Sequence, residues 1–129
     1  MKLLIADDSL LVRNTLKRLV NAMEIPEIEL FQAGNGQEAI EKFKEEKPDA
    51  LILDLLMPEV DGVGVLEHLK EKTHNCFISI LSSNVQDPVK KRCMDMGAHI
   101  FIEKPITHEK MKYFFIKMEK WGGDHYAVP

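Results

Sequence analysis

Short apolar segments alternate with amphipathic segments along the whole 129-residue chain. The apolar segments predict five strands, at about 2–6, 29–33, 50–53, 77–81 and 99–102. After each of them, apolar residues recur at helical spacing, as Val12, Leu16 and Leu19 do after the first. Alternating strands and helices are typical of an α/β fold, because parallel strands need crossover connections and helices supply them. The pattern therefore predicts five strand–helix units around a parallel sheet.

Capping and turn residues mark the ends of these units. Ser9 is a suitable N-cap for the first helix, and Gly97 is a suitable C-terminal stop for the fourth. The last helix is predicted at about 108–120. We therefore expect one domain over residues 1–120, a size that can bury a single core, and a short C-terminal tail over residues 121–129.

The composition is that of an ordinary soluble globular domain, with 45% hydrophobic and 29% charged residues. Lysine and arginine total 17 against 21 acidic residues, and this net charge of −4 argues against general affinity for nucleic acid. No apolar stretch reaches the roughly 20 residues of a membrane span, and too few apolar residues precede Asp7 for a signal peptide. Cys76 and Cys93 lack metal-type spacing and are expected to be reduced core thiols. The predicted location is the cytoplasm.

The polar residues best suited to binding or catalysis follow the ends of the predicted strands. Asp7 and Asp8 follow the first strand, and Asp54 follows the third. Ser82 follows the fourth strand, and Lys104 follows the fifth. In open parallel sheets, ligands bind beyond the carboxyl ends of the strands. Three carboxylates that meet at this edge repel one another, so the site would favour a cation.

These residue types suit phosphoryl transfer assisted by a hard divalent cation. A carboxylate can attack phosphorus and form an acyl phosphate. Because both reactants are anionic, positive charge is needed, and Mg²⁺ held by one or two carboxylates supplies it. A lysine can hold one phosphoryl oxygen, and a hydroxyl can donate to another. The chain offers each part once: Asp54 as nucleophile, Asp7 and Asp8 for the metal ion, and Lys104 with Ser82 for the phosphoryl group.

Four segments together resemble the motifs of the response-regulator receiver domain, the phosphoacceptor half of two-component signalling. They are 3–9 (LLIADDS), 53–62 (LDLLMPEVDG), 80–83 (ILSS) and 101–105 (FIEKP). The resemblance covers residues 1 to about 120 and is closest in kind to single-domain regulators of the chemotaxis type. It implies a flavodoxin-like, doubly wound (βα)5 fold, whose five parallel strands have the order 2-1-3-4-5.

The resemblance also implies a role for each residue at the acidic edge. Asp54 matches the aspartate that is phosphorylated in the family. Asp8, Asp54 and the backbone carbonyl of Leu56 would bind Mg²⁺, with Mn²⁺ as an alternative ion. Asp7 would support the ion through water. Lys104 matches the family lysine that contacts the phosphoryl group.

Two further matches imply a conformational switch. Ser82 stands where the family has Thr or Ser, and Phe101 stands where it has Tyr or Phe. After phosphorylation the Ser82 hydroxyl would move toward the new oxygens, and the Phe101 ring would move inward. Asn84 occupies a position that tunes the lifetime of the phosphoryl group in such domains. The Lys104–Pro105 peptide bond is expected to be cis, since such bonds essentially require proline.

The partners implied by the resemblance are proteins. A sensor histidine kinase or a phosphotransfer protein would supply the phosphoryl group. The fourth helix, fifth strand and fifth helix would form the output surface for a downstream protein target. Its exposed residues are expected to include four lysines: Lys90, Lys91, Lys110 and Lys117. Direct nucleic-acid contact and membrane insertion are not expected, the chain would be a monomer or weak dimer, and the pathway would be chemotaxis or another phosphorelay.

Other functions fit these residues less well. An aspartyl-phosphate phosphatase or phosphotransferase would place its nucleophile after the first strand with a second acid two residues on, and Asp7–Asp8 lacks that spacing. A flavodoxin-like cofactor binder would present hydroxyl and N–H groups there, whereas two carboxylates repel a phosphate. A receiver-shaped module that never carries phosphate would lack an acid or the lysine. We therefore expect no enzyme, only self-phosphorylation and autodephosphorylation at Asp54.

One alternative remains open for the chain as a whole. It could be a receiver cut out of a longer response regulator, for example one that binds DNA. The pair Gly122–Gly123 would then be the stub of a linker. In either case the chemistry at the acidic edge would be the same.

Overall fold

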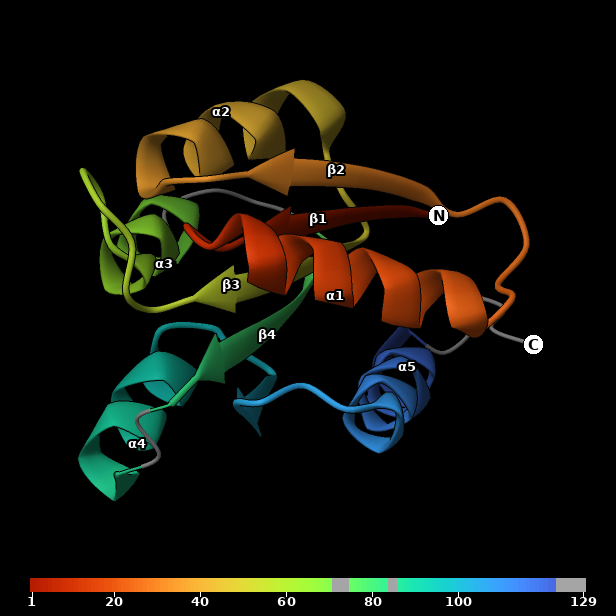
Figure 1. Cartoon of the computed structure of the whole chain (residues 1–129). Coiled ribbons are helices and arrows are strands. Elements are labelled where there is room, and N and C mark those ends of the chain that lie inside the picture. The colour runs from red at the N-terminus through yellow and green to blue at the C-terminus, as the bar shows by residue number, and fades with distance from the viewer. Residues whose placement is uncertain (71–74, 84–85, 123–129) are drawn as a thin grey trace.

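The five strands form one parallel sheet in the order β2-β1-β3-β4-β5. A computed structural model describes residues 1–70, 75–83 and 86–122. Its strands are β1 (Lys2–Ala6), β2 (Glu29–Ala33), β3 (Ala50–Asp54), β4 (Phe77–Ser82) and β5 (Ile100–Glu103). Figure 1 shows the arrows of β1, β2 and β3 pointing the same way, and all four neighbouring pairs of strands are parallel, so the carboxyl ends of the strands share one edge of the sheet. The flavodoxin-like order 2-1-3-4-5 expected from the sequence is confirmed.

One helix follows each strand, and the helices divide between the two faces of the sheet. They are α1 (Leu10–Ala22), α2 (Gly36–Glu46), α3 (Gly62–Lys70), α4 (Asp87–Asp95) and α5 (His108–Gly122). One core cluster contains Leu16 of α1 and Phe114 of α5. The other contains Phe43 of α2, Leu66 of α3 and Cys93 of α4. The sheet is therefore covered on both sides, which is the doubly wound arrangement expected from the sequence.

The central position of β1 and β3 follows from their continuous apolar sequences. Successive side chains of a strand point to opposite faces of the sheet. In β1, Leu3 and Ile5 join the cluster with α1 and α5, whereas Leu4 and Ala6 join the cluster with α2, α3 and α4. A strand that is buried on both faces needs apolar residues at every position, and this places β1 and β3 inside the sheet.

Short polar caps connect the strands to the helices at the carboxyl edge. Ser9 Oγ accepts a hydrogen bond from Val12 N–H at 3.2 Å, which confirms Ser9 as the N-cap of α1. Asn35 Oδ1 does the same for Glu38 N–H, at 2.8 Å, at the start of α2. Gly97 follows α4 with a φ of +105°, a conformation that favours glycine.

Three strands extend one residue beyond their predicted ends, and in β5 the added residue is Glu103. β3 continues to Asp54 and β4 continues to Ser82, because the parallel ladder pairs Asp54 with Leu81 and Ser82 with Glu103. Apolar patterning does not detect these positions, since a backbone ladder forms whatever the side chain. As a result, Asp54 and Ser82 belong to the rigid sheet rather than to the loops that follow it.

Helix α5 continues to Gly122, past the end predicted at residue 120. The ring centroid of Trp121 lies 4.7 Å from that of His99 and 5.6 Å from that of Phe77. These aromatic contacts hold the last turn of α5 against the sheet. Residues 123–129 of the expected tail lie outside the described residues, as does Asn84.

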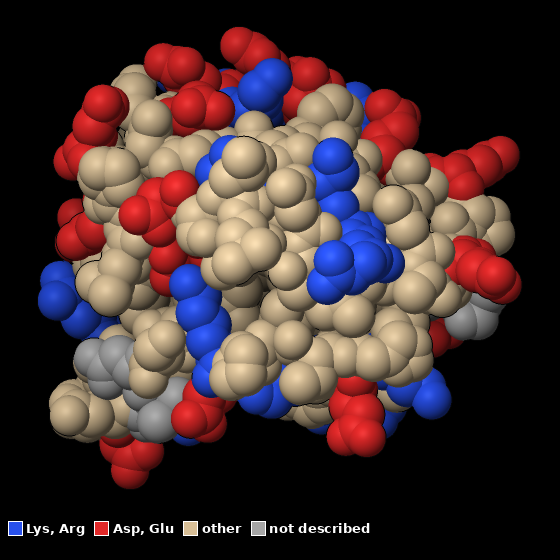
Figure 2. Space-filling model, viewed as in Figure 1, with Lys and Arg blue, Asp and Glu red and all other residues tan. Residues whose placement is uncertain are grey.

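Other expectations from composition can be compared with the structure. Cys76 and Cys93 are buried free thiols, as predicted. Within the described ranges, none of the helices combines the length and the apolar character that crossing a bilayer requires. On the face shown in Figure 2, acidic side chains gather along the upper edge, and basic side chains form a small cluster over α1 rather than an extended stripe.

Candidate functional site

Three carboxylates meet at the carboxyl edge of the sheet. β1 and β3 are neighbours, with Ala6 paired to Leu53, so the residues that follow them lie side by side. Carboxylate oxygens of Asp7, Asp8 and Asp54 all lie within 4.8 Å of one another. Asp7 and Asp54 are buried, with 1% and 3% of their surface exposed, whereas Asp8 is exposed. The acids predicted from the sequence therefore form one pocket with an exposed carboxylate at its rim.

Lys104 brings a positive charge into this acidic pocket. Its Nζ lies 3.0 Å from Asp7 Oδ2 and 3.5 Å from Asp54 Oδ1. Its backbone N–H donates to the carbonyl oxygen of Ser82 at 2.9 Å, and the Lys104–Pro105 peptide bond is cis. The ammonium group therefore reaches from the end of β5 across the end of β4 and is shared between the two buried acids.

The loop after β1 is held by contacts that the sequence analysis did not predict. Asp7 Oδ1 accepts a hydrogen bond from Ser9 N–H at 2.9 Å. Arg13 Nη1 donates to the carbonyl oxygen of Asp7 at 2.6 Å, and Arg13 Nε donates to Gln32 Oε1 at 3.1 Å. Arg13 therefore ties the acidic loop to β2. The available signal was its position about one helical turn after the N-cap, which brings it back toward the end of β1.

Burial and the neighbouring charges shift the pKa of two groups in the pocket. Burial raises the pKa of Asp54 above its ordinary value of 3.8, and the charge of Asp7 raises it further. The Lys104 ammonium and the Leu56 N–H, 3.4 Å from Asp54 Oδ1, oppose this increase. Burial alone would lower the pKa of Lys104, but Asp7 and Asp54 outweigh it and hold that pKa above 10.5. The pocket thus holds one charged lysine among three acids and is short of positive charge.

The donor atoms of the pocket fit a hard divalent cation. Carboxylate oxygens are the ligands that Mg²⁺ and Mn²⁺ prefer in proteins. Asp7 Oδ2 is buried, and the Lys104 ammonium, 3.0 Å away, is its charge partner. Because this one ammonium is shared between Asp7 and Asp54, a bound cation would supply the charge that the three carboxylates still lack.

The raised pKa of Asp54 predicts a pH dependence of stability. Without divalent cations, we expect the free energy of unfolding to fall as the pH rises from below 3.8 through the raised pKa. In this window the folded protein binds more protons than the unfolded chain, so linkage gives a negative slope. Asp54→Asn should remove this part of the slope and make the protein more stable at neutral pH. Urea unfolding from pH 4 to pH 8 in the presence of a chelator measures the effect.

Asp95→Asn provides the matched control, because Asp95 is an exposed acid at the end of α4. It should keep the slope of the wild-type protein. If the wild-type protein and Asp54→Asn had equal slopes, the pKa of Asp54 would not be raised in the folded protein.

The two predicted switch residues lie on the neighbouring strands β4 and β5. Ser82 is the last residue of β4 and is 1% exposed; the residue before it, Leu81, pairs with Asp54 across the ladder. Phe101 lies on β5, half-buried against the cluster with α2, α3 and α4. Lys90 Nζ lies 5.7 Å from the centroid of its ring. Ser82 is therefore next to the strand end that carries Asp54, and Phe101 has surface left to bury.

The four lysines predicted on the output surface are not all exposed. Lys91 is exposed, but Lys90, Lys110 and Lys117 are half-buried. Lys90 and Lys117 place their ammonium groups over aromatic rings, and Lys110 bonds to backbone carbonyls. The prediction was wrong for these three because the carbon chains of long basic residues lie along neighbouring surface.

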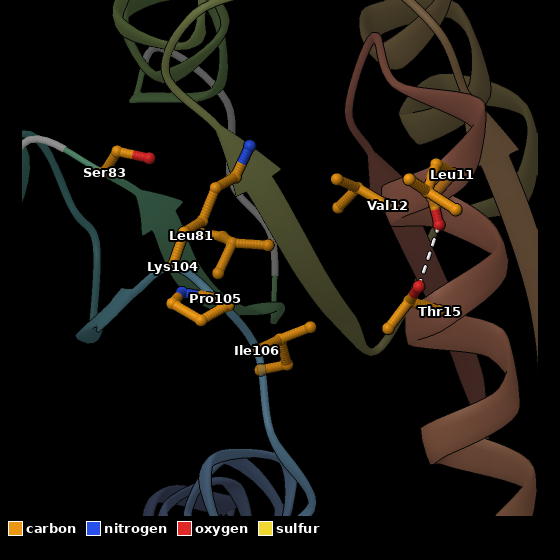
Figure 3. A pocket seen from close by; sticks show the side chains of 8 residues that line it. All are labelled: Leu11, Val12, Thr15, Leu81, Ser83, Lys104, Pro105 and Ile106. Atoms are coloured by element: carbon orange, nitrogen blue, oxygen red, sulfur yellow. Dashed lines mark hydrogen bonds between the residues drawn. The ribbon is translucent and has the colours of Figure 1, made fainter.

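Apolar surface borders the acidic pocket on one side. A cavity of about 410 Å³ lies between α1 and the loop from β5 to α5. Figure 3 shows the side chains that line it. It is lined by Leu11, Val12, Thr15, Leu81, Ser83, Lys104, Pro105 and Ile106. Leu10, Leu11 and Leu56 are 60%, 76% and 73% exposed, respectively. Large exposed apolar side chains next to a charged site are typical of a surface that another protein covers.

The fold is that of a known family. The family model for the response regulator receiver domain matches residues 3–114, and the chain therefore belongs to this family. Within it, the chain closely resembles the chemotaxis protein CheY. The sequence is 32% identical over 111 residues to CheY of Listeria monocytogenes. This match covers 86% of this chain and 92% of that protein.

Other relatives carry the domain within a longer protein. The chain is 37% identical over 111 residues to a protein-glutamate methylesterase/protein-glutamine glutaminase of Treponema denticola; the match covers 84% of this chain and 29% of that protein.

Among solved structures, the CheX–CheY–BeF3–Mg²⁺ complex from Borrelia burgdorferi matches with a TM-score of 0.82 and 27% identity, over 90% of this chain and 87% of that chain.

Proposed function

We propose that this receiver domain takes a phosphoryl group from a histidine kinase or a phosphotransfer protein onto Asp54, and then controls a protein partner. The proposal rests on one observation: carboxylate oxygens of Asp7, Asp8 and Asp54 lie within 4.8 Å of one another, with Lys104 Nζ 3.0 Å and 3.5 Å from the two buried acids. The similarity to CheY supports it, because the similar structure of CheY from Borrelia burgdorferi is named as a complex with CheX, BeF3 and Mg²⁺.

The acidic pocket is proposed to hold Mg²⁺, with Mn²⁺ as an alternative ion. Asp8, Asp54 and the backbone carbonyl of Leu56 would be the protein ligands, and Asp7 would support the ion through water. The shortage of positive charge in the pocket supports this assignment, because one lysine is shared among three carboxylates. When bound, the ion neutralises charge on the phosphoryl oxygens.

Each residue of the pocket has a distinct part in the transfer. An oxygen of Asp54 attacks phosphorus and forms the acyl phosphate bond, while the bond from phosphorus to the donor nitrogen breaks. The electron pair of that bond stays on the nitrogen, which then takes a proton. Lys104 holds one phosphoryl oxygen with its ammonium group, and Ser82 donates its hydroxyl hydrogen to another.

The switch is proposed to couple Asp54 to the surface formed by α4, β5 and α5. A phosphoryl group on Asp54 would attract the Ser82 hydroxyl, and Phe101 would then bury the part of its ring that is exposed. This is a population shift between two packings, biased by the new hydrogen bond. The packing of Lys90 over the Phe101 ring supports the idea, because movement of the ring would also displace a charge on α4.

The setting of this chemistry is proposed to be a cytoplasmic signalling pathway, either chemotaxis or another phosphorelay. The exposed leucines and the cavity beside Lys104 suit a phosphodonor protein that docks over the pocket. The receiver unit would be the domain at 1–120 with the rest of α5, acting as a monomer or weak dimer. We propose signalling rather than enzymatic catalysis on a second substrate, without direct nucleic-acid contact or membrane insertion.

A small phosphodonor with Mg²⁺ tests the assignment of Asp54. We expect intact mass measurement to show one added phosphoryl group on the wild-type protein and none on Asp54→Asn. Chelation of the metal should prevent the reaction of the wild-type protein. Asp61→Asn is the matched control: Asp61 is an exposed acid in the following loop, and the asparagine oxygen can still accept the hydrogen bond from Gly64 N–H. Labelling that persists in Asp54→Asn would refute the choice of nucleophile.

A further inference from the structure

Lys110 makes two hydrogen bonds that single it out from an ordinary surface lysine. Its Nζ donates to the carbonyl oxygen of Glu103 at 2.8 Å and to that of Pro105 at 3.0 Å. These two residues flank Lys104, whose ammonium group lies between the buried acids. Lys110 therefore bonds to the backbone on both sides of the residue that is proposed to hold the phosphoryl group.

The bond from Lys110 to the Glu103 carbonyl helps to fix the orientation of the Glu103–Lys104 peptide group. The carbonyl of Glu103 and the N–H of Lys104 belong to the same planar unit. The N–H donates to the carbonyl oxygen of Ser82 at 2.9 Å, and the carbonyl accepts from Lys110. Because both ends of the plane are bonded, its orientation is set, and with it the direction in which the Lys104 side chain leaves the backbone.

The position of Lys110 on α5 is unfavourable for the helix alone. Lys110 lies in the first turn, and its N–H donates to Thr107 Oγ1 at 3.2 Å. A positive charge near a helix N-terminus is opposed by the helix dipole. The side chain turns back to the loop from β5, where two carbonyl oxygens surround its ammonium group. These contacts, rather than helix stability, account for a lysine at this place.

We propose that Lys110 is a positioning residue, which holds the loop from β5 to α5 so that Lys104 points into the acidic pocket. This inference rests on the proposed function of Asp54 and Lys104. It adds the first turn of α5 to the parts of the chain on which phosphorylation depends. Lys110 itself touches neither the metal site nor the phosphoryl group, so its effect on the reaction must pass through Lys104.

Lys110→Met tests the proposal, since methionine keeps the carbon chain but donates no hydrogen bond. We expect amide exchange at Lys104 to become about tenfold faster, and phosphorylation by a small phosphodonor at saturating Mg²⁺ to become about tenfold slower. The affinity for Mg²⁺ should change less than about twofold, because the lysine is not a metal ligand. Lys110→Arg should retain most of the rate, since arginine can also donate to the two carbonyls.

Two controls separate positioning from general effects. Lys112→Met removes an exposed lysine from the same helix and should behave as the wild-type protein. In a Lys104→Ala background, Lys110→Met should cause no further loss of rate, because a residue that acts through Lys104 has nothing left to position. An equal loss in that background, or equal behaviour of Lys110→Met and Lys112→Met, would overturn the proposal.

Failure of the proposed function would be recognised separately. If the wild-type protein takes no phosphoryl group, Asp54 is not a phosphoacceptor. The exchange measurement still decides whether Lys110 holds the loop, because it needs no phosphate. Unchanged exchange at Lys104 in Lys110→Met would then overturn the positioning role by itself.

Discussion

Replacing Gly62 by alanine is expected to destabilise the protein by about 3 kcal/mol or more. A Cβ atom at Gly62 would collide with the carbonyl oxygen of Asp54 and would lie 2.6 Å from Leu55 Cα. These are backbone atoms, which cannot rotate away as a side chain can. The start of α3 is also bonded to the same segment, since Gly62 N–H donates to the Leu55 carbonyl at 2.9 Å. Any relief of the collision must therefore move the segment that carries Asp54.

Gly64→Ala is the matched control within the same helix. The nearest atom to its added Cβ would be Val60 Cγ1, at 2.7 Å, which is the end of a side chain and can move. Alanine is favoured over glycine inside a helix by about 1 kcal/mol, so the net change should stay within about 1 kcal/mol. Urea unfolding of both variants measures the difference. If Gly62→Ala proved as stable as Gly64→Ala, the claim that α3 packs too closely on the Asp54 backbone to admit a Cβ atom would be refuted.

The fold was predictable because its signals repeat along the chain. The apolar runs of β1 and β3 indicate strands that are buried on both faces, and helical spacing after each run indicates the crossovers. The site was predictable for a related reason. Polar residues such as Asp7 and Asp54 end apolar strands, and parallel strands bring their carboxyl ends together. The parallel topology thus brings residues that are distant in sequence close together in space. The register of β1 on β3 confirms this.

The contacts that orient the site were not predictable in the same way. Arg13 bonds to the carbonyl of Asp7, and Lys110 bonds to the carbonyls of Glu103 and Pro105. Every residue has a carbonyl group, so such a bond leaves no pattern in the sequence. It depends on where a long side chain lies after the helix has packed. For the same reason, the sequence placed Lys110 only among the exposed residues of the output surface.

The charges of the pocket affect both the stability of the fold and the proposed chemistry. Asp7 and Asp54 are buried, and Lys104 is shared between them, so the pocket holds more negative than positive charge. A protein selected for stability alone would not keep this arrangement, because like charges in a buried site oppose folding. The imbalance is useful if a divalent cation and then a phosphoryl group complete the site.

Lys104→Met is expected to separate these two roles. Without divalent cations, the variant should lose about 2 kcal/mol of stability, since the acids lose their counter-charge; the loss is limited because the side chain is 23% exposed. Saturating Mg²⁺ should restore most of this stability, because bound cation neutralises the same carboxylates. Phosphorylation should still be slower by about 100-fold, since the ammonium contact with a phosphoryl oxygen is missing. Urea unfolding with and without Mg²⁺, and phosphorylation followed by mass, measure the two effects.

The separation distinguishes Lys104 from a lysine that only balances charge. If charge balance were its whole contribution, Mg²⁺ would restore the phosphorylation rate together with the stability. Lys112→Met, which removes an exposed charge from α5, should change neither property. A rate for Lys104→Met within about threefold of wild type at saturating Mg²⁺ would contradict the proposed contact, because a charge-assisted hydrogen bond to the transferred group should be worth more than that.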